Sequence, residues 1–363
     1  MARRLQSDRI LFAAVVGLVL FGALMVFSAS AVMAADRYNN ADYFLVRQLA
    51  WAAVGMIALA ALMNTDYRRL ASPLVVFPAL AVELILLVAV LFVDRSHNTH
   101  RWFHIGPASL QPSELAKIVL VLFLAFFLNL RKAEVNDWKH TLAAICLVFG
   151  VMAALILKEP DLGTTLAMCL ILAAMLFAAG LNLRYFVIAG LGSLFPLYWL
   201  IFHSTYRHNR ILAFLNPYSD PLGKGFQILQ SYIAVGTGGI TGVGLMEGKQ
   251  KLFFLPEPQT DFIFAVISEE LGLIGALAVV AVFAVILVRG LRASAACQDR
   301  FGKLLALGLT VMIIGQALVN ISVVLGLLPT KGIPLPFISY GGSSLLVNLV
   351  AVGILLNISQ QAS

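Results

Sequence analysis

Long apolar runs constrain this chain more than any other feature of its sequence. A membrane hydrocarbon core is about 30 Å thick, and an α-helix needs about 20 apolar residues to cross it. About ten segments of the 363-residue chain approach that length with few charges. They are residues 10–33, 44–63, 73–93, 115–130, 142–157, 162–181, 185–202, 262–288, 304–328 and 343–358. Because only 12% of the residues are charged, against roughly 25% in an average soluble domain, a water-soluble fold is excluded.

Basic residues predict how these spans are oriented, because cytoplasmic loops carry more Lys and Arg than outer loops do. With the N-terminus inside, the cytoplasmic basic residues are Arg3, Arg4, Arg9, Arg68, Arg69, Arg131, Lys132, Lys139, Arg184, Arg289, Arg292, Arg300 and Lys303. The short outer loops then hold the smaller set of Arg37, Arg47, Arg95, Arg101, Lys117, Lys158 and Lys331. Both termini are therefore predicted to be cytoplasmic. The net charge of +7 suits an anionic inner leaflet and gives no reason to expect nucleic-acid binding.

One polytopic membrane domain, residues 1–363, is predicted, with one large extracytoplasmic loop at 203–261 between the seventh and eighth spans. No internal similarity between halves, of the kind found in many transporters, is visible in the sequence. Cys146 and Cys169 fall within spans and Cys297 in a cytoplasmic loop. Neither an outer disulfide nor a metal-ligand spacing is therefore expected.

Two outer segments are rich in glycine, proline and aromatic residues. Within the large loop, FQILQSYIAV (226–235) is predicted to form a short interfacial helix flanked by glycine-rich turns. Between the last two spans, PTKGIPLPFISYGGSS (329–344) is apolar but cannot be helical throughout. Such backbone is tolerated at membrane depth only inside protein or beside a water-filled cavity. Both segments are therefore expected to line one outward-open cavity.

Asp261 is the main catalytic candidate. It ends the large loop and opens the eighth span in LPEPQTDFIFAVISEELG (255–272), where Thr260 is expected to cap the helix. A carboxylate at a helix N-terminus is ordinarily stabilised by the helix dipole, so capping is one interpretation of Asp261. The alternative is a general base at the mouth of the cavity. Helix-end stabilisation would lower its pKa and desolvation would raise it.

Other charged residues near the outer surface are candidates for supporting roles. Glu114 and Lys117 are three residues apart in QPSELAK (111–117) and are expected to share a helix face, with a local ion pair as the simplest interpretation. Basic residues of the outer loops could together hold an anionic lipid-linked substrate. They are Arg207, Arg210, Lys224, Lys249, Lys251 and Lys331. Glu269 and Glu270 point to different faces of one helix, and Glu270 is expected to pack against a basic partner.

At these residues the sequence resembles the SEDS family (shape, elongation, division and sporulation). The resemblance spans nearly the whole chain, and its most specific motifs are LPEPQTDFIFAVISEELG and PLPFISYGGSS. It also includes FSAS (27–30), DYRRL (66–70), RWFHIGPASLQPSELAK (101–117) and KEPDLGT (158–164). These motifs look more like the division branch, FtsW, than the elongation branch, RodA. The resemblance implies an all-α membrane fold of about ten helices in the bacterial inner membrane.

The resemblance further implies a glycosyltransferase that polymerises lipid II, the undecaprenyl-pyrophosphate-linked precursor of peptidoglycan. An α-linked donor becomes a β-1,4 linkage, so one inverting displacement needs a base on the acceptor hydroxyl and cations on the leaving pyrophosphate. The family pattern implies Asp261 as the base, Arg210 and Lys331 as leaving-group stabilisers, and the Glu114–Lys117 pair as support. Glu257, Lys158 and Ser343 lie in the same motifs and are further supporting candidates. No covalent cofactor is expected, and Mg²⁺ or Mn²⁺ near Asp261 is the candidate metal.

The resemblance implies as partners a class B penicillin-binding protein transpeptidase and other membrane proteins of the division or elongation machinery. Two rival functions remain open at the sequence level. A lipid II flippase would suit ten helices with intramembrane charges, although the missing repeat and the outward clustering of the candidates disfavour it. A non-catalytic division scaffold would leave Asp261 and the ordered loops without a role.

Overall fold

The structure is a computed structural model that describes residues 8–94, 100–105 and 108–361. Within these residues, ten helical segments are long and apolar enough to cross a membrane, as the sequence predicted. They are α1 (Arg9–Tyr38), α2 (Tyr43–Met63), α3 (Pro73–Val93), α4 (Pro112–Leu130), η3 with α5 (Trp138–Leu142 and Ala143–Lys158), α6 (Leu162–Ala179), α7 (Leu183–Phe202), α10 (Ile263–Ala296), α11 (Arg300–Val324) and α12 (Gly342–Gln361). Helices suit this environment because each satisfies its own backbone polar groups in lipid.

Several boundaries differ from the sequence prediction. Helix α10 continues to Ala296, well past the predicted end at residue 288, and α11 ends at Val324 instead of 328. The spans were predicted from apolar length alone, and a helix can extend beyond its apolar stretch into water, as α10 does. Arg3, Arg4 and Arg95, which entered the orientation prediction, lie outside the described residues.

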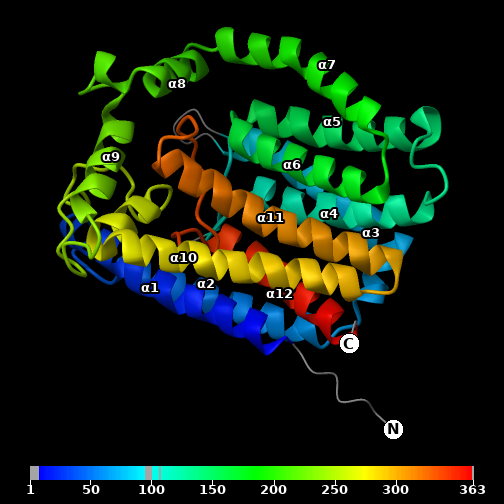
Figure 1. The fold of residues 1–363 in the computed structure, drawn as a ribbon, viewed down its shortest axis with the longest axis horizontal. Coiled ribbons are helices and arrows are strands. Elements are labelled where there is room, and N and C mark those ends of the chain that lie inside the picture. The colour runs from blue at the N-terminus through cyan, green and yellow to red at the C-terminus, as the bar shows by residue number, and fades with distance from the viewer. Residues whose placement is uncertain (1–7, 95–99, 106–107, 362–363) are drawn as a thin grey trace.

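Helices α11 and α12 form the centre of the bundle, and most of their side chains are buried. Helix α11 packs against α4, α6, α10 and α12, and α12 packs closely along α2. Helix α7 is different, because none of its residues is buried. It lies apart from the rest of the bundle and leads into α8 (Thr205–Leu215) at the far end (Figure 1).

The large loop between α7 and α10 is ordered. It contains α8, a short 3₁₀ turn η4 (Pro217–Ser219) and α9 (Phe226–Gly238). Helix α9 confirms the predicted short helix, whereas α8 was not expected, because its polar sequence TYRHNRILAFL shows little sustained apolar character. Both lie at the same end of the molecule, opposite the end where α1 begins and α12 finishes (Figure 1).

A kink in α10 ties the large loop to the bundle. Gly272 has φ 62°, so α10 leaves helical geometry there. The polar backbone groups that the kink exposes are paired with the loop: Val243 N donates to Glu269 O, and Leu273 N donates to Gly239 O. Glycine fits at 272 because this left-handed conformation and the close approach of the loop leave no room for a Cβ atom.

Buried charges hold the rest of that loop. Glu270 accepts hydrogen bonds from Ser28 Oγ at 2.7 Å and from Lys251 Nζ at 2.6 Å. Glu269 accepts from the backbone N–H groups of Lys249 and Gln250. Glu270 therefore has the basic partner expected from the sequence, and Lys251 is occupied in a buried ion pair instead of facing a substrate.

A small β-hairpin precedes α4. Strand β1 (Phe103–Ile105) pairs antiparallel with β2 (Ala108–Leu110). Ser343 at the start of α12 fixes this hairpin to the bundle, since its Oγ donates to Ser109 O and accepts from Gln111 N, each at 3.0 Å. The sequence did not predict the hairpin, which packs beside the loop between α11 and α12.

The opposite end of the bundle is joined by polar contacts among several loops. The 3₁₀ helix η1 (Tyr67–Ala71) connects α2 to α3, and its Tyr67 hydroxyl donates to the carboxylate of Asp299. Asn357 links the segment around Tyr67 to α12 by accepting from Tyr67 N at 3.0 Å and donating to Met63 O at 2.8 Å. These contacts explain the DYRRL motif as a structural connection.

Candidate active site

Asp261 lies in irregular backbone just before α10. The helix begins at Ile263, and its N-cap residue, Phe262, makes no side-chain capping bond. Thr260 donates instead to Glu257 O at 3.0 Å, so the prediction that Thr260 caps the helix is wrong. The capping interpretation of Asp261 fails as well, because no hydrogen bond joins its carboxylate to the first turn of α10 in the described structure. Its carboxylate is therefore available to a molecule bound in the cavity that it lines.

The segment carrying Asp261 is held against the loop between α11 and α12. Ser339 Oγ donates to Thr260 O at 2.6 Å, and Tyr340 N donates to Gln259 O at 2.8 Å. At Gly332 the two segments approach so closely that an added Cβ atom would lie 3.0 Å from Asp261 Oδ2. The loop that contains PLPFISYGG therefore holds the Asp261 segment in place, and we call residues 332–340 the cradle.

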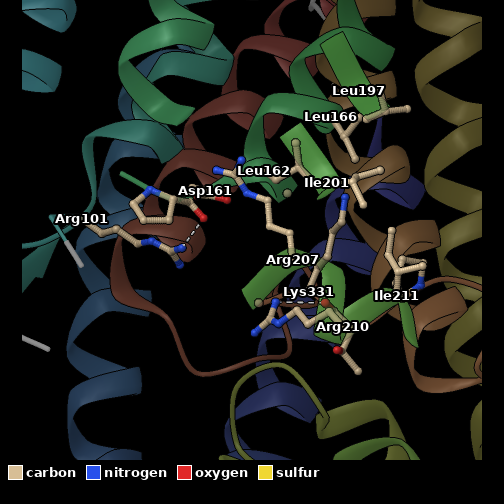
Figure 2. Close-up of a pocket in the computed structure, with 15 residues that line it drawn as sticks. Arg101, Asp161, Leu162, Leu166, Leu197, Ile201, Arg207, Arg210, Ile211 and Lys331 are labelled. Carbon is tan, nitrogen blue, oxygen red and sulfur yellow. Dashed lines mark hydrogen bonds between the residues drawn. The ribbon is translucent and has the colours of Figure 1, made fainter. Parts of the chain in front are cut away.

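A cationic cavity of about 240 Å³ opens beside this cradle. Figure 2 shows that Arg207, Arg210 and Lys331 line this cavity, with Arg101 and Asp161 on one side of it. Arg210 reaches the cavity from α8 and donates to Thr330 O at 3.0 Å. The basic groups thus come from three separate parts of the chain, which only the fold brings together.

The other side of the cationic cavity is apolar. Leu166 of α6 lies beside Leu197 and Ile201 of α7 there, as Figure 2 shows. A site that combines clustered Arg and Lys with an apolar wall at the membrane surface suits an amphiphile with an anionic head and a hydrocarbon tail.

A second, polar cavity of about 370 Å³ adjoins the first and contains Asp261. The two cavities share Arg101 and Gly332 in their walls. The remaining side chains of the second cavity are neutral hydrogen-bonding and aromatic groups, among them Trp102, His104, Ser109, Gln111, Thr260 and Tyr340. Such a lining is typical of carbohydrate recognition, because hydroxyl groups need donors and acceptors while sugar faces pack on aromatic rings.

Arg101 is anchored at the boundary between the cavities. Its Nε donates to Glu159 O at 2.7 Å and one terminal nitrogen donates to Pro160 O at 2.6 Å. These bonds use the carbonyls at the turn between α5 and α6, so the KEPDLGT motif positions an arginine as well as Asp161. Asp161 itself caps α6 by accepting from Thr164 N at 3.0 Å.

Burial and neighbouring charges adjust two ionisable groups of the site. The pKa of Asp261 is raised to about 7, chiefly by burial, which Arg210 opposes and Glu257 reinforces. Burial also lowers the pKa of Lys331 to about 8, an effect that Arg210 reinforces and Asp161 opposes. A carboxylate with a pKa near neutrality is well matched to accept a proton at physiological pH.

Glu114 and Lys117 form the expected ion pair, with 2.9 Å between Lys117 Nζ and Glu114 Oε2. Both side chains are buried and line neither cavity. Lys117 Nζ also donates to Gln316 Oε1 at 2.6 Å, and Gln316 Nε2 donates to Pro334 O at 2.9 Å. The pair therefore supports the cradle through Gln316 and does not contact the space available to a substrate.

The other candidates are placed differently. Glu257 is exposed and accepts from Gln259 Nε2 at 2.9 Å, and it influences Asp261 through its charge. Ser343 holds the β-hairpin instead of facing a ligand. Lys158 is exposed and lines neither of these two cavities, so its role as a site residue stays a prediction.

Sequence reasoning missed several residues of the site. Trp102, His104, Gln111 and Tyr340 line the polar cavity, and Arg101 joins the two cavities. The only sequence signal for them was their presence in the RWFHIGPASLQ and PLPFISYGG segments, because neutral polar residues in loops have no distinctive spacing. Two buried amides of α11, Gln316 and Asn320, were missed because they lie within an apolar span.

No group of three or more His, Cys, Asp or Glu side chains converges on a metal site among the described residues. Mg²⁺ is nevertheless often held by one or two carboxylates together with substrate phosphate oxygens. Asp261, beside the cationic cavity, fits this second kind of site.

Comparisons with known proteins decide the family. Residues 8–363 match the model of the cell cycle protein family that comprises FtsW, RodA and SpoVE. This chain belongs to the FtsW/RodA/SpoVE family. It is 45% identical to the probable peptidoglycan glycosyltransferase FtsW of Trichlorobacter lovleyi, over 98% of this chain and 94% of that protein. It is 41% identical to the stage V sporulation protein E of Bacillus subtilis, over 99% and 98% of the two chains.

Solved structures confirm the fold. One chain of a peptidoglycan synthase complex, described as coordinating polymerization and crosslinking, matches with a TM-score of 0.80 and 31% identity over 98% of both chains. The rod shape determining protein RodA of Thermus thermophilus matches with a TM-score of 0.73 and 27% identity, over 99% of this chain and 98% of that one. The resemblance stated from the motifs is therefore confirmed across the chain.

Proposed function

We propose that this family member is a peptidoglycan glycosyltransferase that polymerises lipid II at the outer surface of the bacterial inner membrane. The position of Asp261 is the observation that best supports this function. Its carboxylate does not cap α10, and it lies where a cationic cavity meets a neutral polar cavity. The relatives named as probable peptidoglycan glycosyltransferases support the same enzyme class.

The two cavities suit the two substrates. The pyrophosphate of the growing strand would lie among Arg207, Arg210 and Lys331, with its lipid tail leaving past Leu166 and Ile201 into the bilayer. The terminal sugar of the incoming lipid II would occupy the polar cavity. This arrangement brings the acceptor hydroxyl to Asp261 and the leaving group to the cations.

The reaction follows from that arrangement. The acceptor 4-hydroxyl attacks the anomeric carbon of the donor while Asp261 accepts its proton, and the bond from that carbon to the pyrophosphate oxygen breaks. Arg210 and Lys331 stabilise the charge that develops on the departing undecaprenyl diphosphate. One displacement inverts the anomeric centre and gives a β-1,4 linkage. A divalent cation held by Asp261 and the pyrophosphate would supply further charge neutralisation.

We assign the cavity end of the bundle to the extracytoplasmic side and both termini to the cytoplasm. The end opposite the cavities carries the basic residues Arg68, Arg289 and Arg300 in or near its short loops, as cytoplasmic loops do. A crosslinking transpeptidase of the class B penicillin-binding proteins is the proposed partner. The solved synthase complex supports it, because that assembly combines polymerization with crosslinking. The identity to FtsW proteins favours a division role over elongation.

The test is polymerisation by the purified protein with its transpeptidase partner, lipid II and Mg²⁺ or Mn²⁺. We expect glycan strands from the unaltered protein and none from Asp261→Ala. Polymer formed at the normal rate by Asp261→Ala would refute the assignment of the base. Translocation of lipid II across liposomes without polymer would favour a flippase, and absence of both activities would favour a scaffold.

A further inference from the structure

Asn320 connects the segment of Asp261 to the loop that carries Lys331. Its side-chain Nδ2 donates to Asp261 O at 2.8 Å and to Ile333 O at 2.7 Å. The side chain is only 1% exposed, so these bonds are shielded from water. The reversed amide would set an oxygen against two carbonyl oxygens, and therefore the donor orientation is the consistent one.

These two bonds hold the backbone at Asp261 itself and close to Lys331. Asp261 belongs to an irregular segment that precedes α10, where no helical ladder fixes the backbone. Ser339 and Tyr340 hold the two residues before Asp261, whereas Asn320 holds Asp261 itself. Ile333 follows Gly332, which lies against the Asp261 carboxylate, and Lys331 comes immediately before. One rigid amide thus sets the spacing between the carboxylate and the lysine.

Helix α11 gives this clamp a rigid support. It is the most central helix of the bundle with α12, and Asn320 lies one turn beyond Gln316 on it. Gln316 holds Pro334, the residue after Ile333, and is itself held by the buried Lys117. Two adjacent carbonyls of one loop are therefore fixed from the same rigid helix.

We propose that Asn320 is a positioning residue for glycosyl transfer: by bridging Asp261 and Ile333 it keeps the base and the leaving-group cation at the spacing that one displacement requires. This inference rests on the proposed function of Asp261 as the base. A misplacement of about 1 Å can reduce a rate about 100-fold, so a clamp on the backbone of the base is expected to affect turnover directly.

The experiment compares Asn320→Ala with Asn357→Ala in the full chain with its transpeptidase partner. Asn357 is a matched control, because it is also a buried Asn that bridges two segments, but at the opposite end of the bundle. We expect Asn320→Ala to lower kcat about 100-fold with KM for lipid II within about twofold. Asn357→Ala should lower the melting temperature and leave kcat within about twofold.

A double variant distinguishes a positioning role of Asn320 from a general loss of structure. If Asn320 acts through the base, Asp261→Asn combined with Asn320→Ala should be no slower than Asp261→Asn alone. An additive loss, or an unchanged kcat in Asn320→Ala, would overturn the inference while leaving the proposed function intact. A normal rate of polymerisation by Asp261→Asn would instead refute the proposed function.

Asn320→Leu keeps the side-chain volume without the donors and is expected to fold. If both Asn320→Leu and Asn320→Ala failed to fold, Asn320 would be a structural residue and the inference would fail.

Discussion

The two walls of the cationic cavity differ in how tightly they are packed. On one side, the loop carrying Lys331 and the segment carrying Asp261 are bonded to the buried Asn320 of α11 and to each other. On the other side, α7 has no buried residue and leads into α8, which supplies Arg207 and Arg210. Asp261 and Lys331 are thus held by the rigid part of the molecule, while the two arginines and the apolar wall belong to a part with little packing to resist movement.

This difference suits a lipid-linked substrate. A base must be held within a fraction of an ångström, whereas a long hydrocarbon tail must enter and leave sideways through the membrane. A loosely packed helix beside a fixed cradle meets both requirements.

The first prediction concerns the base. Asp261→Asn should lower kcat/KM for lipid II polymerisation by about 10²–10⁴-fold, since general-base catalysis contributes about that factor. Asp36→Asn makes the same chemical change at an exposed position on α1 and should leave the rate within about threefold. Equal rates for the two variants in a polymer assay would contradict the assignment.

The second prediction compares two ion pairs at opposite ends of α4. Lys117→Met should destabilise the protein by about 3–5 kcal/mol, because it leaves the Glu114 carboxyl buried without its partner. Arg131→Gln removes the exposed Arg131–Glu134 pair, which has the same spacing, and should cost less than about 1 kcal/mol. Unfolding in detergent measures both, and similar losses would show that the rigid wall does not depend on the buried pair.

The third prediction is a pH dependence. The pKa of Asp261 is raised to about 7, so its basic form and kcat/KM should increase as the pH rises through 7. The pKa of Lys331 is lowered to about 8, so its charge and the rate should be lost above that pH. Lys331→Arg should abolish the alkaline fall, because guanidinium stays protonated. An alkaline limb that persists in Lys331→Arg would assign it to another group.

The fourth prediction measures the packing of the two walls directly. Leu309→Ala in α11 removes a fully buried side chain and should destabilise the protein by about 2 kcal/mol through the cavity it leaves. Leu191→Ala in α7 changes a side chain that is 66% exposed and should cost less than about 0.5 kcal/mol. A large loss from Leu191→Ala in a thermal melt would mean that α7 is packed more firmly than the structure indicates.

Much of the fold could be predicted from local sequence. Ten apolar runs predicted ten spans, because crossing a hydrocarbon layer imposes a minimum length that composition reveals. The short helix α9 was also foreseen from an apolar segment between glycines. Helix α8 and the β-hairpin were not, because the polar sequence of α8 and the three-residue strands of the hairpin carry no distinctive apolar pattern.

The site was predictable only in part, for the same reason. Asp261, Arg210 and Lys331 drew attention as charged residues in apolar or loop surroundings, where an ionisable group is costly without a function. Trp102, Gln111 and Tyr340 drew none, since neutral residues in loops acquire meaning only when a cavity forms around them. Lys158 and Lys251 met the same criterion of charge, yet Lys158 lines neither cavity and Lys251 is paired with Glu270.

The sequence by itself determined that this chain spans a membrane about ten times, and its motifs determined the family, because hydrophobic length and motif identity are local properties. Tertiary structure decided which charges meet. It showed that Asp261 does not cap α10, that Glu114 and Lys117 act from beneath the cradle, and that Asn320 joins residues 59 and 13 positions away. Those outcomes depend on contacts between distant segments, and no local pattern records them.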